Sequence, residues 1–231
     1  FNFSVTVTNS LGASALASVQ LTTTARVVPS ITIATTPAKF NPSDKVILTG
    51  TIVAIGNIAL ASWTSPSVPS LAAIAGSATS KTIVSGTPIY QLSLNAYSLT
   101  AGLTYTFSLT ANYNGNTDIA TASVTVIVNA PPVGGVVTTA PATGSALLTQ
   151  YLISTSMWTD DASDLPLKYV LSYYTLSAAS LITIKAQDSV TFATTLLGQG
   201  LQSLSYRVTI VASAADVYEC SANTTASALV L

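Results

Sequence analysis

The sequence predicts an all-β protein made of tandem sandwiches of the immunoglobulin-like or fibronectin-III-like kind. β-branched and aromatic residues alternate with Ser or Thr in short runs, and Gly, Pro and Asn separate these runs. No segment offers a helix of useful length, although the Ala-rich stretch Leu71–Ser80 has room for one helical turn. A strand pair also recurs at a spacing of roughly 100 residues, which is the size of such a sandwich.

Alternation along the chain places the expected strands. In the first part they are Phe3–Thr8, Ser18–Thr23, Ser30–Ala34, Val46–Ala54, Ile58–Trp63, Ile89–Ala96, Thr104–Ala111 and Ala120–Val128. In the second part they are Ala146–Ser154, Leu167–Tyr174, Leu181–Ala186, Ser189–Thr194, Ser205–Ala212 and Ala226–Leu231. Each run shows a two-residue period, so one face is expected to meet a core while the other faces solvent.

Self-comparison reveals the recurring strand pair. The segment Leu103–Ala111 aligns with Leu204–Ala212, and Phe1–Thr8 aligns with Tyr105–Asn112. Each copy is followed by a polar turn and a second strand, as expected for the last two strands of a sandwich.

The repeat predicts three parts: the final hairpin of one domain over residues 1–28, a complete sandwich over 29–129 and another over 130–231. Because the chain starts and ends within predicted strands, we expect it to be a piece of a longer protein. Proline residues at the junctions, including Pro131 and Pro132, fix the backbone and favour a rod over loosely linked domains.

Composition limits the possible functions. Charged residues make up 6% of the chain, against about 25% in ordinary soluble domains. The seven Lys and Arg residues form no cluster, which argues against nucleic-acid binding. No run approaches the roughly 20 apolar residues of a membrane span. Three explanations suit so uncharged a surface: covalent sugars, burial against neighbouring copies, or hydration by Ser and Thr hydroxyls alone.

Catalytic residue types are almost absent. The chain has no His, which excludes a Ser-His-Asp triad and deprives the only cysteine, Cys220, of a His partner. We therefore expect no enzymatic activity. Cys220 has two interpretations: a small buried hydrophobic residue of a strand, or one half of an intermolecular disulfide.

Two further features point to modification or ligand binding. The acidic cluster Asp160, Asp161 and Asp164 has two interpretations, a weak Ca²⁺ site or a turn whose carboxylates accept backbone N–H bonds. No other cofactor is expected. Asn2 and Asn223 each begin an N-glycosylation sequon.

Three aromatic residues fit structural positions of a sandwich. Trp63 lies in the third expected strand of the middle domain, where such folds bury a tryptophan. Tyr105 and Tyr206 lie near the start of the penultimate strand of their domains, where a tyrosine corner is expected.

The stretch between the two complete sandwiches carries an unusual set of motifs. It has a hinge with Pro131, Pro132, Gly134 and Gly135, then Gly144-Ser-Ala-Leu-Leu-Thr149, Trp158-Thr-Asp160 and Leu165-Pro166-Leu167-Lys-Tyr169. This combination resembles the receptor-for-egg-jelly (REJ) module of the polycystin family. The resemblance covers residues 30–231 and is most specific in the second half.

One departure from the family pattern concerns a disulfide. The family usually has a Cys after the Gly-Gly pair and another shortly before the Trp. Those positions correspond to Val137 and Thr155 here, so both cysteines of the pair are replaced together.

The resemblance implies an extracellular, cell-surface segment, flagellar or ciliary in some settings, that occurs with immunoglobulin-like and PKD-like domains. Two hypotheses follow. The first is a structural protein whose sandwiches build a filament, coat or flagellar appendage, with other copies or other surface proteins as partners and covalent glycans attached. The second is the stalk of a polycystin-like receptor or channel that senses force, glycans or another cell. A glycan-binding adhesin is a third possibility, but no cluster of aromatic residues supports it.

Overall fold

The computed structural model describes residues 1–22 and 27–231, and the all-β prediction is confirmed. The end of the predicted strand Ser18–Thr23 lies outside the described residues. Near the N-terminus, β1 (Asn2–Thr8) and β2 (Ser14–Gln20) form an antiparallel hairpin. Every side chain of both strands is exposed. This includes Phe3 and Val5, apolar side chains on one face of β1 of the kind that a sandwich normally buries. That this hairpin completes a further sandwich stays a prediction.

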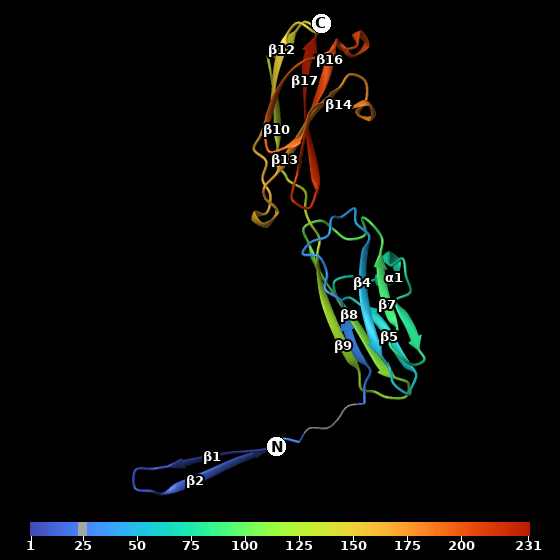
Figure 1. Ribbon diagram of the computed structural model, residues 1–231, viewed down its shortest axis with the longest axis vertical. Coiled ribbons are helices and arrows are strands. Elements are labelled where there is room, and N and C mark those ends of the chain that lie inside the picture. Colours follow the sequence, from blue (N-terminus) through green and yellow to red (C-terminus); the bar gives the residue numbers. More distant parts are fainter. Residues whose placement is uncertain (23–26) are drawn as a thin grey trace.

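The middle sandwich has seven strands in two sheets (Figure 1). They are β3 (Ser30–Ile33), β4 (Val46–Val53), β5 (Ala59–Thr64), β6 (Ser80–Ile83), β7 (Ile89–Leu94), β8 (Thr104–Tyr113) and β9 (Ala120–Ile127). One sheet has the order β3-β4-β7 and the other β6-β5-β8-β9. The first, second and fifth strands thus face the other four. The fourth strand, β6, pairs with the third, whereas in the constant-type immunoglobulin sandwich it lies beside the fifth. The predicted helical turn is α1 (Leu71–Ile74).

The core of this sandwich follows from strict alternation. Along β8, every second side chain from Tyr105 to Tyr113 is buried. Trp63 on β5 and Phe107 on β8 are almost fully buried, and the Trp63 ring lies 6.4 Å from that of Tyr90. Each large apolar side chain withdrawn from water contributes about 1.5–3 kcal/mol.

The C-terminal sandwich repeats this plan with one added strand. Its strands are β10 (Val136–Ala140), β11 (Thr143–Gly144), β12 (Gln150–Ser156), β13 (Lys168–Tyr174), β14 (Ile182–Asp188), β15 (Phe192–Leu196), β16 (Arg207–Ala215) and β17 (Ser221–Val230). One sheet has the order β10-β12-β15 and the other β11-β17-β16-β13-β14. The added strand β11 runs parallel to β17. Short 3-10 turns lie at Ala162–Asp164, Ala178–Ser180 and Gln202–Leu204.

The recurring strand pair forms the last hairpin of each complete sandwich, β8–β9 and β16–β17. Strand boundaries differ from the predictions in several places. The predicted strand Ala146–Ser154 starts too early, because residues 145–149 form a turn in which the Thr149 N–H donates to the Ser145 carbonyl. Strands β6, β10 and β11 were not predicted, since each is short and poor in large apolar residues.

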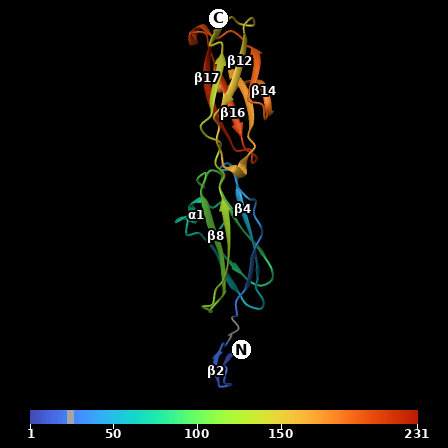
Figure 2. The same cartoon turned by 90° about the vertical axis from the view of Figure 1, so that its left-hand side faces the viewer.

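The two complete sandwiches lie end to end along the long axis (Figures 1 and 2). The chain passes from β9 to β10 through Pro131 and Pro132. Among the described residues, no helix has the length and apolar character needed to cross a membrane.

Candidate functional site at the junction of the two sandwiches

Polar side chains from both sandwiches meet at their junction. From the middle sandwich, Lys39 donates to both carboxylate oxygens of Asp164, at 2.6 Å each, and to Asp161 at 3.0 Å. Asn129, which follows β9, donates from Nδ2 to Oδ2 of Asp216 at 2.6 Å. Asn41 donates to the carbonyl of Tyr218 at 2.6 Å. These bonds tie the end of one sandwich to the loops of the next.

The ion pair of Lys39 with Asp164 is nearly enclosed. The side chain of Asp164 is fully buried, and that of Lys39 is 11% exposed. Burial by itself lowers the pKa of Lys39, but the hydrogen bonds to Asp164 and Asp161 outweigh it, so the pKa lies above its ordinary value. The Ser163 hydroxyl donates a further bond to Asp164. The buried carboxylate of Asp164 therefore has its ammonium partner in the other sandwich.

Asp216 organises the loop between β16 and β17. Its Oδ1 accepts the N–H groups of Tyr218 at 2.8 Å and Cys220 at 2.9 Å, which is how an Asp side chain stabilises a turn. Cys220 is half-buried and is the only cysteine of the chain. Burial, with the charges of Asp216 and Asp160, raises the pKa of its thiol. An intermolecular disulfide through Cys220 stays a prediction, and the raised pKa makes its thiolate scarce.

The acidic cluster has a different membership from the one that sequence proximity indicates. Carboxylate oxygens of Asp160, Asp164 and Asp216 lie within 4.8 Å of one another. The side chain of Asp161 is exposed and bonds Lys39, while its backbone N–H donates to Oδ1 of Asp160 at 2.8 Å. Burial, followed by the charges of Asp164, Asp216 and Asp161, raises the pKa of Asp160. Sequence reasoning missed Asp216 because it lies far along the chain, in another loop.

The hinge and the Trp-x-Asp motif, distant in sequence, pack against each other. Val133 and Thr159 exchange two backbone hydrogen bonds of 2.9 Å. Gly135 lies so close to the Trp158 ring that an added Cβ would be 2.1 Å from it. The indole N–H of Trp158 donates to the Thr155 hydroxyl at 2.7 Å. Any larger residue at position 135 would therefore have to displace the Trp158 ring.

A comparison with protein families matches residues 1–231 to the family described as REJ domain. The chain belongs to the REJ domain family. This confirms the resemblance drawn from the hinge and Trp-x-Asp motifs, and it extends the match to the N-terminal hairpin. No curated protein matches the chain.

Solved structures similar to this REJ chain are multi-domain proteins. A crystal structure of titin domains is 13% identical, with a TM-score of 0.43, covering 100% of this chain and 75% of that one. The chicken CNTN1 FN1–FN3 domains are 13% identical, with a TM-score of 0.33 and coverage of 99% and 77%. Salmonella alpha-2-macroglobulin is 9% identical, with a TM-score of 0.32; the match covers 98% of this chain but 18% of that protein.

The two positions that correspond to the family's cysteines face each other. Val137 on β10 and Thr155 on β12 are direct cross-strand partners, and both are buried. The Thr155 hydroxyl donates to the carbonyl of Val136 at 2.9 Å while accepting the Trp158 bond. A hydrogen-bonded threonine and a valine thus occupy the place that the resemblance assigns to a disulfide.

The remaining predicted residues are dispersed over both sandwiches. Trp63 is buried, and its indole N–H has no hydrogen-bond partner among the described residues. The hydroxyl of Tyr105 accepts the N–H of Thr100 at 3.0 Å. Tyr206 is half-buried with a φ of 58° at the entry to β16. Tyr169 on β13 accepts a bond from Lys185 at its carbonyl.

Three other predicted positions lie near the surface. The peptide bond before Pro166 is cis, and the Pro166 side chain is exposed. Asn2 on β1 and Asn223 on β17 are exposed, so both sequons are sterically open to an attached sugar.

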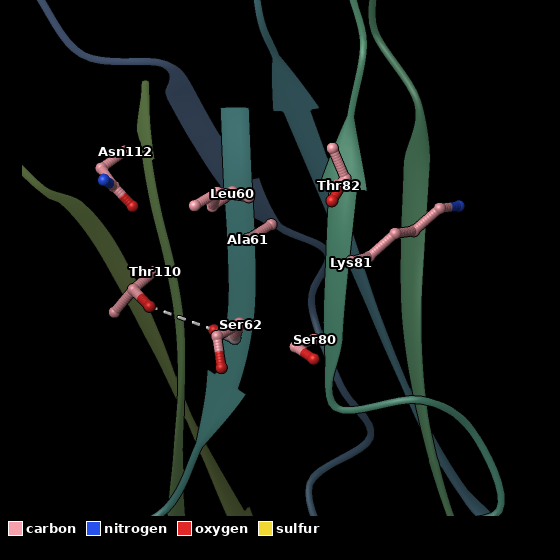
Figure 3. A pocket seen from close by; sticks show the side chains of 8 residues that line it. All are labelled: Leu60, Ala61, Ser62, Ser80, Lys81, Thr82, Thr110 and Asn112. Atoms are coloured by element: carbon pink, nitrogen blue, oxygen red, sulfur yellow. Dashed lines mark hydrogen bonds between the residues drawn. The ribbon is translucent and has the colours of Figure 1, made fainter. Parts of the chain in front are cut away.

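A shallow groove of about 350 Å³ lies on the outer face of the sheet β6-β5-β8-β9 (Figure 3). Hydroxyl groups of Ser62, Ser80 and Thr110 line it, with the amide of Asn112. The Lys81 ammonium extends away from these hydroxyls and lies 5.9 Å from the ring centre of Tyr90. The groove offers hydrogen bonds but no carboxylate in its lining, so its chemistry suits weak polar contact rather than proton transfer.

Proposed function

We propose that this REJ chain is a non-enzymatic structural segment of an extracellular protein, whose tandem sandwiches build a filament, coat or flagellar appendage on the cell surface. The observation that carries the proposal is the presence of exposed apolar side chains, without charged neighbours, on an outer sheet face. On the sheet β10-β12-β15, Leu152, Phe192 and Leu196 are each about half exposed and are flanked by hydroxyl residues instead of charges.

Such a surface favours contact between copies. The chain has 15 charged residues out of 231, so electrostatic repulsion between copies is weak. Exposed apolar side chains that are grouped into one patch mark interaction surfaces, whereas single scattered ones are common on any protein. Sugars at Asn2 and Asn223 would cover other parts of the surface and leave this sheet free, because neither residue lies on β10, β12 or β15.

Absence of catalytic groups supports a non-enzymatic role. No His occurs in the sequence, and the carboxylates at the junction bind Lys39 and backbone N–H groups. Their arrangement holds two domains together, which is a mechanical task.

Sedimentation velocity of residues 1–231 tests the assembly proposal. We expect concentration-dependent association that is lost in the double variant Leu152→Lys, Phe192→Lys, since two added charges would have to be buried in the contact. Val84→Lys, at an exposed position of the middle sandwich, is the matched control and should associate like the parent. A parent chain that stays monomeric at high concentration would reject the proposal.

A stalk of a polycystin-like receptor or channel is the second candidate. Family membership favours it, as does the end-to-end junction, in which a buried ion pair can transmit tension from one sandwich to the next. Peptide mapping of the native protein separates the two. Several hydrophobic segments of roughly 20 residues elsewhere in the parent protein would support the stalk, whereas their absence together with self-association would support the filament.

A further inference from the structure

The junction holds more negative than positive charge. Asp164 and Asp216 are fully buried, and oxygens of Asp160 lie within 4.8 Å of both. Together with Asp161 these make four acidic side chains, and Lys39 is the one cation bonded to them among the described residues. Lys39 contacts Asp164 and Asp161, so Asp160 and Asp216 face each other without an ammonium between them. Buried carboxylates in this proportion favour a further cation.

A second, independent observation lies beside the cluster. The Asn129 side chain is fully buried, and its Oδ1 has no hydrogen-bond partner among the described residues. Its Nδ2 touches Asp216 at 2.6 Å and Oδ1 of Asn41 at 3.1 Å. Oδ2 of Asp160 is likewise buried without a partner. Buried acceptors are normally satisfied. The oxygen of Asp160 inside the cluster, and the oxygen of the Asn129 amide that bonds Asp216 through Nδ2, therefore leave two acceptors for a cation.

The two ends of the Asn129 amide exchange by a half-turn about one bond. That rotation would bring Oδ1 toward Asp216 Oδ2 and Asn41 Oδ1. Three oxygens repel one another unless a cation lies among them. The amide therefore offers a donor to Asp216 in one orientation and a metal ligand in the other.

We propose that the junction binds one Ca²⁺ ion between Asp160, Asp164 and Asp216, with the Asn129 side-chain oxygen as a ligand from the other sandwich. All the ligand atoms are hard oxygens from flexible carboxylates and amides, which suits Ca²⁺ with its six to eight ligands better than the strict octahedron of Mg²⁺. Lys39, which bonds both oxygens of Asp164 in the absence of the ion, would give up at least one of them to Ca²⁺ and keep its contact with Asp161 on the outer side. Water completes the coordination.

The proposed ion would join two domains. Its carboxylates come from the C-terminal sandwich, and Asn129 belongs to the end of the middle one. Sites in extracellular modules bind with dissociation constants of about 10⁻⁴–10⁻³ M, so this site would fill at extracellular calcium and stiffen the junction. This inference concerns the junction alone and does not depend on self-assembly.

Calorimetric titration of chelator-treated protein, residues 1–231, with CaCl₂ tests the site, alongside thermal unfolding in calcium and in chelator. We expect one ion per chain with a dissociation constant of about 10⁻⁴–10⁻³ M and a rise in the midpoint of unfolding. Asp160→Asn should weaken binding at least about tenfold. In chelator the same variant should be more stable than the parent, because one of the crowded charges is removed.

Two further variants keep the test decisive. Asp161→Asn is the matched control, because Asp161 is the neighbouring acidic residue and also contacts Lys39 but is not a proposed ligand. This variant should change calcium affinity only about threefold or less. Asn129→Asp should tighten calcium binding and weaken the fold in chelator, since it adds a carboxylate to the cluster.

Two results would overturn the proposal. One is the absence of heat and of any thermal shift at about 10 mM calcium, well above the usual range for such sites. The other is an equal loss of affinity in Asp160→Asn and Asp161→Asn, which would mean diffuse attraction.

Discussion

Twenty buried apolar residues form the core of the middle sandwich, whereas the core of the C-terminal sandwich has ten. Polar burial runs the other way: Thr155, Asp164, Ser172 and Asp216 are buried in the C-terminal sandwich, while Asn129, at the junction, is the fifth buried polar residue. The same strand order is thus stabilised by apolar packing in one case, and by a smaller core plus a polar junction in the other. We expect the C-terminal sandwich to be the less stable of the two, because hydrophobic burial is the larger favourable term.

The largest expected effect comes from truncating repeat-equivalent core residues. Leu109 and Ile210 occupy matching positions of the penultimate strands, and both are fully buried. Leu109→Ala and Ile210→Ala should each cost about 2–5 kcal/mol. Differential scanning calorimetry should show Ile210→Ala lowering an earlier transition and Leu109→Ala a later one. A C-terminal sandwich that melts last would contradict the comparison.

Sequence reasoning located the long strands of the two sandwiches well and missed short ones. Long alternating runs such as Thr104–Tyr113 were predicted almost to their ends, because half of their side chains are apolar and point one way. Short strands were missed: Val136–Ala140 buries only Val137, and its other residues are exposed or partly exposed. The position of this strand depends on pairing with β12, which no local pattern records.

The second comparison concerns the glycine that each sandwich packs near its tryptophan. A Cβ on Gly135 would lie 2.1 Å from the rigid ring of Trp158, whereas one on Gly50 would meet the movable end of Leu109 at 2.3 Å and the Trp63 ring at 3.2 Å. Gly135→Ala should therefore cost about 1–3 kcal/mol, and Gly50→Ala less, since overpacking is relieved where a side chain can turn. Urea unfolding of both variants measures the difference. Equal costs would show that the Trp158 ring moves freely.

A disulfide should raise the stability of the weaker sandwich. Val137 and Thr155 are direct partners on paired antiparallel strands, where Cα atoms lie about 4.5–5.5 Å apart. Val137→Cys with Thr155→Cys, made in a Cys220→Ala background, should add about 3 kcal/mol when oxidised, less about 1 kcal/mol for the lost Thr155–Trp158 hydrogen bond.

Reduction supplies the control for this disulfide. The reduced double variant should unfold before the parent in the same background, and the oxidised one after it, in denaturant titrations. If both forms unfold before the parent, the backbone at this pair does not accept a disulfide.

The candidate site shows a different limit of sequence reasoning. Asp160, Asp161 and Asp164 stand out because they are adjacent in a chain with eight acidic residues. Their true neighbours come from distant segments: Asp216 lies in another loop of the same sandwich, and Lys39 belongs to the other sandwich. Sequence spacing therefore found the loop, but only the folded C-terminal sandwich shows which carboxylates share one site.

The smallest expected effect is a pH dependence specific to the junction. The pKa of Asp160 is raised from 3.8, first by burial and then by Asp164, Asp216 and Asp161, while Lys39 faces the cluster from the other sandwich. The folded state therefore binds this proton more tightly than the unfolded chain does. Its contribution to stability is present at acid pH, declines as the pH rises above about 4, and is lost once the pH passes the raised pKa.

Asp188 and Glu219 act in the opposite direction. Hydrogen bonds from Lys185 and Gln187 respectively lower their pKa values, so their contributions to stability are lost as the pH falls below about 4. Comparing the parent with Asp160→Asn cancels these common terms. In chelator, the variant should gain stability relative to the parent as the pH rises from 4 to 7, measured by urea unfolding at each pH. A constant difference across that range would mean that Asp160 titrates alike in the folded and unfolded chains, and that the junction places no electrostatic strain on the C-terminal sandwich.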